Sequence, residues 1–413
     1  MAAAFLLAGA AMTSMAGAES LGFRNEAALV HEAKTAYDNK YTNIQWNTEA
    51  AENVGAPIAY AESVLVPIGS SIFRYAEENG FKEAEIKLPE QVCDGYSGVM
   101  SGTTLIQPTQ SGICTVDFTT AEITSHRSFD GNVDSDVAVI DDMAYFSVKK
   151  GEDETFYCVE LSAELPVLWE YAAQADITSP TVQGDFVIFG AGDKLVTAHY
   201  TDGSIVEIPV GDVITGTPFA SQYAVFFTTE GGNTIKIRLN DDGTMEEDTL
   251  VTCETGAHSS APLAHNNRLY VTSESGLHIL DSINMERIKL LPDIASGSDP
   301  FLTRGNGPRI YTVAPYEGGR WALYCVYDPG EDVEPQTEIL AVMENYEGGR
   351  SAVSDAGTMY FRDGIGRVYA LTAVGYNIVT IIIRLVIMVL LIAGVFLWIR
   401  MVGKRRAAND YRY

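Results

Sequence analysis

This 413-residue sequence lacks the short motifs that are typical of particular enzymatic reactions. It contains no GxSxG turn, no glycine-rich phosphate loop and no pair of adjacent cysteines. The six histidines lack metal-ligand spacing, and the acidic turns lack the Asp-x-Asp-x-Asp-Gly alternation of a calcium loop. These absences exclude the enzyme classes that leave a local signature. They do not exclude an active site whose residues converge from distant parts of the chain.

Basic residues are also scarce, with 27 lysines and arginines against 55 aspartates and glutamates. Six of the basic residues and one acidic residue lie after residue 376, and none lies in residues 1–18. Residues 19–376 therefore hold 21 basic and 54 acidic residues, a formal charge of −33. Such a surface repels nucleic acid and anionic lipid, so nucleic-acid binding is not expected. Two interpretations remain, attraction for cations or basic partners and ordinary solubility.

Helical periodicity is absent between residues 41 and 372, where short strands separated by glycine-rich turns repeat instead. The clearest unit is 177–203, ITSPTVQGDFVIFGAGDKLVTAHYTDG. Seven further segments match it, and the eight positions equivalent to its proline are Pro57, Val99, Asp136, Pro180, Pro218, Pro262, Pro300 and Ala352. Their mean spacing of about 42 residues is typical of four-stranded propeller blades. The pattern predicts an all-β, eight-bladed β-propeller of four-stranded antiparallel blades.

Two tryptophans predict how the ring closes. Trp46 and Trp169 each lie 11 residues before a repeat proline, Pro57 and Pro180, so both belong on the outer strand that precedes a new blade. The last blade has only three strands of its own, and the strand around Trp46 is expected to complete it. A short helix is expected just before that strand, over Glu26–Tyr37.

The cysteines are predicted to remain unpaired. Cys114, Cys158 and Cys325 occupy the same position in the third strand of three blades, and equivalent positions in a ring are far apart. We interpret them as small buried packing residues. Cys93 and Cys253 lie on segments that enter the second and sixth blades. With five cysteines one must stay free, and no disulfide framework is predicted.

Both ends of the chain carry apolar segments. Residues 1–18 are typical of a secretory signal peptide, with a buried helix as the alternative, and 19–40 lead into the propeller at 41–372. Residues 377–399 are predicted to form one C-terminal transmembrane helix, because the run is long enough to cross a bilayer. Basic residues follow it at once, which predicts a cytoplasmic tail at 400–413 and an extracellular propeller.

One arginine interrupts the predicted span. Arg384 lies six residues inside its outer boundary. Its guanidinium either reaches back to the lipid headgroups or pairs with an acidic residue of a partner helix.

The blade pattern resembles the pyrroloquinoline-quinone-like (PQQ-like) β-propeller repeat family. The resemblance rests on S-x-P or G-x-P before the first strand, G-D or N-R turns, and LWEY on an outer strand. The start, FRNEAALVHEAKTA followed by a tryptophan strand, is similar to that of secreted propeller proteins of anaerobic Gram-positive bacteria. The family name implies a quinone cofactor. However, this sequence lacks the adjacent cysteines of the quinone enzymes and has only Trp46, Trp169 and Trp321 outside the predicted span.

The sequence looks closer to non-enzymatic propellers, such as the lipoprotein scaffold of outer-membrane protein assembly, although it lacks that scaffold's lipidated N-terminal cysteine. We therefore predict no catalytic, cofactor-binding or metal-binding residues, and no cofactor. The expected function is a membrane-anchored, extracellular binding or scaffolding module for envelope proteins or glycans. The alternatives are an envelope protein-assembly factor and a quinone-dependent dehydrogenase-like enzyme. Loops at 151–154, 314–320 and 328–337 are expected to vary without disturbing the core.

Overall fold

The structure, a computed structural model, describes residues 30–31, 42–96, 98–303, 309–330, 333–343, 346, 351–353 and 358–373. They belong to the first of two compact units of the chain, Met1–Ala373. Apart from two three-residue 3-10 helices, Pro292–Ile294 and Glu317–Gly319, their regular structure is strand. None of the helices in these ranges is long and apolar enough to cross a membrane. The predicted signal peptide, membrane span and tail lie outside the described residues.

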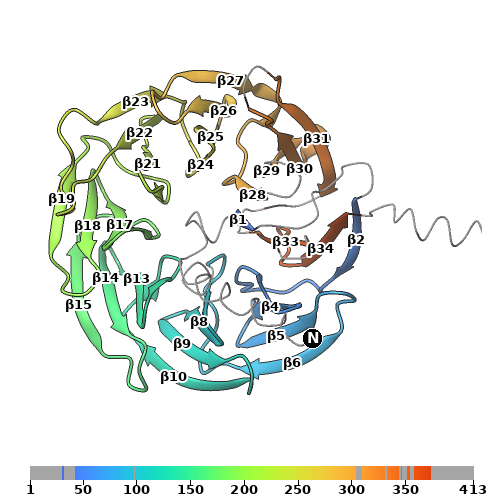
Figure 1. Ribbon diagram of the computed structural model, residues 1–413. Coiled ribbons are helices and arrows are strands. Elements are labelled where there is room, and N and C mark those ends of the chain that lie inside the picture. Colours follow the sequence, from blue (N-terminus) through green and yellow to red (C-terminus); the bar gives the residue numbers. More distant parts are fainter. Residues whose placement is uncertain are drawn as a thin grey trace, which may run out of the picture. The chain divides into compact units, whose positions relative to one another are not determined.

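The strands form eight sheets, antiparallel except for one short parallel pair, that stand as blades around a central axis (Figure 1). Blades one to four contain β3 (Ile58–Tyr60), β4 (Ser63–Ile68), β5 (Ser71–Ala76), β6 (Lys82–Lys87); β7 (Val99–Ser101), β8 (Thr104–Thr109), β9 (Gly112–Asp117), β10 (Glu122–Ser128); β12 (Ala138–Ile140), β13 (Met143–Lys150), β14 (Asp153–Glu160), β15 (Val167–Ala173); β16 (Thr181–Gln183), β17 (Phe186–Ala191), β18 (Lys194–His199) and β19 (Ile205–Pro209).

Blades five to eight contain β20 (Phe219–Ala220), β21 (Val225–Thr228), β22 (Asn233–Ile237), β23 (Val251–Glu254); β24 (Leu263–His265), β25 (Arg268–Ser273), β26 (Gly276–Asp281), β27 (Arg287–Leu291); β28 (Phe301–Thr303), β29 (Arg309–Tyr316), β30 (Arg320–Tyr327), β31 (Gln336–Met343); β32 (Ala352–Val353), β33 (Met359–Arg362), β34 (Val368–Ala373) and β2 (Thr42–Asn47). Two short strands, β11 (Asn132–Val133) and β1 (Val30–His31), extend blades three and seven. The predicted eight-bladed propeller is confirmed.

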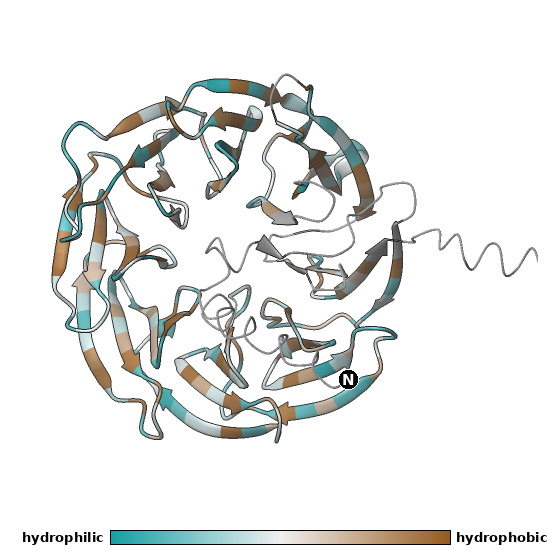
Figure 2. Ribbon diagram, viewed as in Figure 1, coloured by the Kyte–Doolittle hydropathy of each residue, from teal (hydrophilic) through white to brown (hydrophobic). Residues whose placement is uncertain are grey.

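The burial pattern explains why these sequences form blades. Most second and third strands are buried on both faces, as in β17 and β26, because each blade packs between two neighbours. The outer strand β15 instead alternates between half-buried and exposed residues. In Figure 2 the middle strands are mainly in the hydrophobic colour, whereas hydrophobic and hydrophilic colours alternate along the outer strands at the rim. A single blade leaves apolar faces uncovered, so the eight stabilise one another.

The ring closes as the two tryptophans predict. β2, from the start of the chain, pairs antiparallel with β34, the third strand of blade eight, and Trp46 lies opposite Ala370. This pairing completes a fourth strand for blade eight and leaves β34 with no open edge.

Trp169 shows what such a tryptophan does at the junction between blades three and four. Its indole N–H donates to the Tyr200 carbonyl at 3.3 Å, and its ring lies 5.8 Å from that of Tyr145. The Tyr145 hydroxyl donates to the same carbonyl at 2.9 Å. The indole also covers Gly203, where an added Cβ would lie 2.5 Å from the ring. One turn of blade four is therefore held by two side chains of blade three.

Trp46 repeats this arrangement at the junction between blades eight and one. Its indole N–H donates to the Glu77 carbonyl at 3.1 Å, its ring lies 5.8 Å from that of Tyr360, and it covers Gly80. Both glycines have positive φ, +67° at Gly80 and +68° at Gly203, so the turns need glycine for conformation as well as for space. The predicted equivalence of the two tryptophans is confirmed.

Two blades differ from the others. In blades three and seven the second and third strands each have eight residues, whereas the same strands elsewhere have four to six. The predicted loops at 151–154 and 314–320 are shorter than expected: residues 151–152 and 317–319 form the turns, and the flanking residues extend the hairpins β13–β14 and β29–β30. Blades three and seven are four positions apart in a ring of eight, and Figure 1 shows them across the central axis from each other. The predicted loop at 328–337 is a connection up to residue 335, described in part, and its last two residues begin β31.

Two smaller predictions are corrected. The five proline anchors each lie one residue before the first strand of their blade. Val99 and Ala352 are instead the first residues of that strand, and Asp136 lies two residues before β12. These three predicted anchors are therefore each displaced by one residue. Each lacks the proline that marks the position elsewhere. The helix expected over Glu26–Tyr37 is contradicted at Val30–His31, which pairs parallel with β28. An open strand edge outweighs weak helical propensity there, and the rest of that segment lies outside the described residues.

Candidate functional site

The described connections between blades lie on one face of the ring. These connector segments lead from the outer strand of one blade to the inner strand of the next, and they share a side with the hairpin turns between second and third strands. Backbone bridges join the two sets at Val54–Ile68, Val92–Thr109, Ile177–Ala191 and Ile214–Thr229. We call this side, formed by the connectors and those hairpin turns, the connector face. It holds the three polar clusters described below.

The S-x-P motif of the repeat has a structural role on this face. In four blades a hydroxyl two residues before the first-strand anchor accepts a backbone N–H from the second strand. The donor and acceptor pairs are Ser147 to Ser135 (2.8 Å), Gly190 to Thr178 (2.8 Å), Thr272 to Ser260 (2.9 Å) and Val313 to Ser298 (3.0 Å). The repetition shows that these hydroxyls fix each connector against its own blade.

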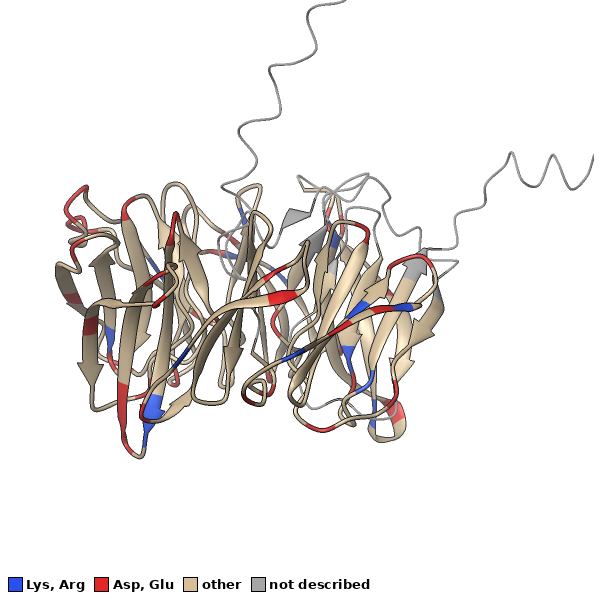
Figure 3. Ribbon diagram, turned by 90° about the horizontal axis from the view of Figure 1, so that it is seen from below, with Lys and Arg blue, Asp and Glu red and all other residues tan. Residues whose placement is uncertain are grey.

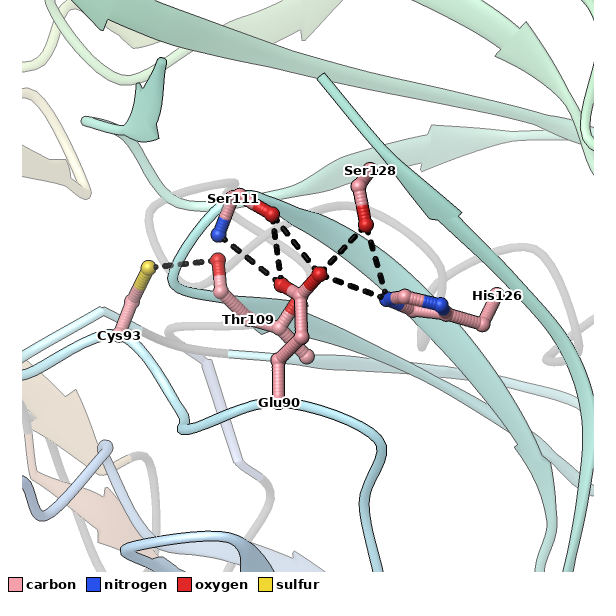
Figure 4. Close-up of polar contacts among 6 residues, drawn as sticks. All are labelled: Glu90, Cys93, Thr109, Ser111, His126 and Ser128. Carbon is pink, nitrogen blue, oxygen red and sulfur yellow. Dashed lines mark hydrogen bonds and ion pairs between the residues drawn. The ribbon is translucent and has the colours of Figure 1, made fainter. Parts of the chain in front are cut away.

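The first cluster surrounds Glu90 on the connector into blade two (Figure 4). Its carboxylate accepts the Thr109 hydroxyl at 3.1 Å, the Ser111 N–H at 3.2 Å and the Ser111 and Ser128 hydroxyls at 2.8 and 2.5 Å. His126 Nε2 lies 3.4 Å away. Burial alone would raise the pKa of Glu90, but the hydrogen bonds from Ser128 and Ser111 outweigh it and lower the pKa. The carboxylate therefore fastens the connector to the hairpin and outer strand of blade two.

The geometry around Glu90 is not that of a catalytic triad. In a triad the two nitrogens of histidine contact different partners, one the nucleophile and one the carboxylate. Here the same nitrogen, His126 Nε2, faces both Ser128 and Glu90. The neighbouring Cys93 thiol donates to the Thr109 carbonyl at 2.9 Å, and burial raises its pKa to about 12. A thiol held protonated in this way is a poor nucleophile.

The second cluster centres on Glu154 in blade three. This side chain is only 1% exposed, and its carboxylate accepts the Ile177 N–H at 2.8 Å and the Ser147 hydroxyl. Burial raises its pKa to about 7, despite the two hydrogen bonds. Ile177 belongs to the connector into blade four, so Glu154 joins two blades. Lys149, one strand away, forms an ion pair with Asp176 on the same connector.

The third cluster lies between blades five and six around His278. Its Nε2 contacts the Ser273 and Ser275 hydroxyls at 3.0 and 2.8 Å, and its Nδ1 is buried with no hydrogen-bond partner. Burial, with a smaller effect from Arg287, lowers its pKa to about 4. A neutral imidazole enclosed by hydroxyls is a packing element, and among the residues that the structure describes no acidic group contacts it to make it a general base.

The cysteines are unpaired as predicted: all five are free, and Cys114, Cys158 and Cys325 are buried. Burial raises the pKa of each of these three to about 12. The predicted equivalence holds for Cys158 and Cys325, which pair with Tyr145 and Tyr311, whereas Thr115 takes that position in blade two and Cys114 is displaced by one residue. Cys253 lies on β23, the outer strand of blade five, and not on a segment that enters blade six.

The residues present do not fit the quinone that the fold resemblance implies. Trp46 and Trp169 lie on outer strands at the rim, and the indole of each packs against a turn of the next blade. Trp321 lies on the third strand of blade seven and packs on Tyr346, 5.4 Å away. None of them supplies a stacking floor at the central axis, and no two cysteines are adjacent. Within the described ranges no three His, Cys, Asp or Glu side chains are grouped to hold a metal.

Solved structures with the same fold define the class of protein. BamB from Moraxella catarrhalis superposes with a TM-score of 0.58 at 11% identity, over 80% of this chain and 99% of that one. A europium-containing methanol dehydrogenase gives 0.56 at 7% identity, over 80% and 93%. The computationally designed Ika8 protein gives 0.56 at 12% identity, over 78% and 98%. No family model and no curated protein matches the sequence. The chain therefore has a PQQ-like β-propeller fold, and these identities establish the fold alone.

The three polar clusters were not identifiable from the sequence. Glu90, Thr109 and Ser128 come from a connector, a hairpin and an outer strand, and Glu154 stands in a stretch rich in exposed acidic residues. The repeated hydroxyl two residues before the anchor does leave a signal, because its bond to the second strand recurs at a spacing of 12 residues in three blades, but it marks the connectors and not the clusters.

Proposed function

We propose that this protein is a non-catalytic binding or scaffolding module, anchored in the cell membrane with its propeller outside and its C-terminus in the cytoplasm. The observation that carries the proposal is the pair of lengthened hairpins, β13–β14 and β29–β30, on opposite sides of the connector face. A partner lying across that face meets both hairpins. The remaining blades form a rigid base whose packing does not depend on the hairpin tips.

The two hairpin tips offer different surfaces. At the tip of β13–β14, Lys149 and Lys150 are paired with Asp176 and Asp130. At the tip of β29–β30, Arg320 lies over the ring of Tyr316, with its Cζ 5.6 Å from the ring centroid. Exposed arginine with tyrosine is typical of protein interaction sites. The blade-seven tip is therefore the stronger anchor for a partner.

A protein partner is favoured over a glycan. The BamB-like propeller fold fits a protein-binding or protein-assembly module, and this supports an envelope protein-assembly factor as the second candidate. Acidic residues lie along the loops of both faces (Figure 3), which favours basic partner surfaces. A quinone-dependent dehydrogenase is disfavoured, because the tryptophans and cysteines do not form the site that such an enzyme needs.

Photo-crosslinking from single sites tests the binding face. A photoreactive residue replaces Glu152 or Glu317, at the two hairpin tips, or Asp202, on a turn of the opposite face. Full-length protein in its native membrane should crosslink to the same envelope protein from both tips and not from Asp202. Equal capture from Asp202, or no shared product from the two tips, contradicts the proposal. Quinone-dependent dye reduction by the purified protein overturns its non-catalytic part.

The proposed anchor rests on the apolar run at 377–399 and the basic residues after it. Protease added to intact cells should remove the propeller and spare an epitope tag at the C-terminus. Protection of the propeller would reverse the proposed orientation.

A further inference from the structure

One lysine of the blade-three hairpin lies beside carboxylates from three elements. Lys149 forms an ion pair with Asp176 on the connector into blade four, and its Nζ lies 3.6 Å from Asp134 Oδ2 on the connector into blade three. Glu154 is the residue directly opposite Lys149 on β14. Opposite residues of an antiparallel pair project to the same face, so Glu154 is a third carboxylate beside the same ammonium. Among the described residues, Lys149 is the only basic side chain that forms an ion pair with any of the three.

The three carboxylates differ in how firmly they are held. Asp134 accepts the Tyr96 hydroxyl at 2.8 Å, which ties it to the connector into blade two. Glu154 is only 1% exposed, and each of its oxygens accepts a hydrogen bond from a neighbouring element. The Asp176 side chain is 82% exposed, and an ion pair to so exposed a group contributes little stability. The Lys149–Asp176 pair is therefore the one most easily given up.

Ionisation of Glu154 changes which ion pair is favoured. Water screens a buried charge poorly, so a cation stabilises a buried carboxylate more than an exposed one. The other strand beside Glu154, β15, places Ala173 opposite it and supplies no cation there. Burial raises the pKa of Glu154 to about 7, with Asp134 among the smaller causes of the rise and Lys149 among those that oppose it. The competition between Asp176 and Glu154 for Lys149 therefore arises near neutral pH.

We propose that Asp134, Lys149, Glu154 and Asp176 form a pH-operated latch between blades three and four. At lower pH Glu154 is protonated, and Lys149 holds Asp176 and with it the connector into blade four. As the pH rises, Glu154 loses its proton to water, draws Lys149 away from Asp176 and releases that connector. The latch lies within this chain and needs no partner, so its test is independent of the proposed binding function.

Hydrogen exchange of the purified full-length protein in detergent tests the latch. Between pH 6 and pH 8 the exchange of residues 174–178, corrected for its intrinsic pH dependence, should accelerate by roughly tenfold, because the junction loses stability as Glu154 ionises. Glu154→Gln fixes the neutral form and should show no such acceleration. The connector into blade five, residues 210–216, is the internal control and should not respond. Equal acceleration in both proteins, or none in the unaltered one, overturns the proposal.

Two variants should move the midpoint of this transition in opposite directions. Asp176→Asn frees Lys149 for Glu154 and should shift the midpoint to lower pH. Lys149→Met removes the ammonium and should shift it to higher pH. Lys194→Met removes a surface ion pair with Glu207 in blade four and should leave the midpoint unchanged. Shifts of the first two variants in the same direction, or an equal shift from Lys194→Met, contradict the latch. If Lys149→Met fails to fold, the direction of the Asp176→Asn shift decides.

Discussion

Glu154 is unusual among the 55 acidic residues because folding removes it from water. Its two hydrogen bonds, from Ile177 and Ser147, suit a carboxylate, yet burial prevails and raises its pKa to about 7. The protonated form is thus favoured in the folded state and the ionised form in the unfolded state. A residue that joins two blades therefore makes the junction sensitive to pH near neutrality.

The sign of this effect gives the first prediction. A raised folded pKa contributes stability that is fully present below about pH 4.5 and is lost as pH rises through about 7. Glu154→Gln keeps the acceptor for Ile177 and a donor for Ser147 without the charge. It should therefore stabilise the protein at pH 8 by roughly 2–3 kcal/mol and have little effect at pH 4.5. Urea unfolding at the two pH values measures this difference, and an equal effect at both would refute it.

His278 predicts the opposite pH dependence. Its pKa is lowered to about 4 in the folded state from an ordinary value near 6.5, so its contribution to stability is present above about pH 6.5 and is lost as pH falls toward 4. His278→Gln should remove that part of the acid destabilisation, because glutamine does not titrate. Thermal melts from pH 7 to pH 4 should show a shallower decline for the variant. Parallel curves for the two proteins would contradict the assignment.

At the scale of elements, the tryptophan junctions make a matched pair. Trp169→Ala removes the ring over Gly203 and the bond to the Tyr200 carbonyl, at a cost of about 3 kcal/mol. Trp46→Ala should cost a similar amount, because its contacts are the same in kind. Leu168→Ala, beside Trp169 but half exposed, is the control and should cost under about 1 kcal/mol. Chemical denaturation of the three variants tests this, and a small cost at either tryptophan contradicts it.

The closing strand gives the next prediction. Deletion of residues 19–50 removes β2 and leaves β34 with an unpaired edge, so the protein should aggregate or melt at a markedly lower temperature. Deletion of residues 19–40 alone keeps β2 and should melt close to the intact protein. Similar melting of both deletions would show that β2 does not hold the ring closed.

The same element also shows how far sequence reasoning reaches. The spacing of Trp46 from Pro57 predicted the closing strand, because repeated units place equal residues at equal distances. Residues 151–154 were predicted as a loop, because the polar run around Glu154 looks solvent-exposed and only tertiary packing buries that carboxylate. Asp153 and Glu154 instead begin β14. The Glu90 cluster had no local signal, since its members span residues 90–128 and meet only when three elements pack.

At the scale of the whole molecule, acidic residues far outnumber the basic residues that could pair with them. Residues 19–376 hold 54 acidic and 21 basic residues, so ion pairs cannot neutralise most of the carboxylates. The ion pairs that exist are largely at the surface, such as Lys194–Glu207 and Lys150–Asp130, and pairs of this kind contribute about 0–1 kcal/mol each. Repulsion among the remaining acidic groups opposes the compact state and draws basic partners toward it.

Salt therefore weakens both the stabilising ion pairs and the destabilising repulsion among acidic groups. The excess of acidic residues decides which of the two changes dominates the melting temperature. Raising sodium chloride from 50 to 500 mM shortens the Debye length from roughly 14 to 4 Å, which weakens both the surface ion pairs and the repulsion. Because uncompensated acidic groups outnumber the pairs, relief of repulsion should prevail and the melting temperature should rise by several degrees. Sucrose at matched osmolality separates screening from solvent exclusion. A melting temperature that falls with sodium chloride would mean that the ion pairs between blades, and not the −33 charge, set the stability of the ring.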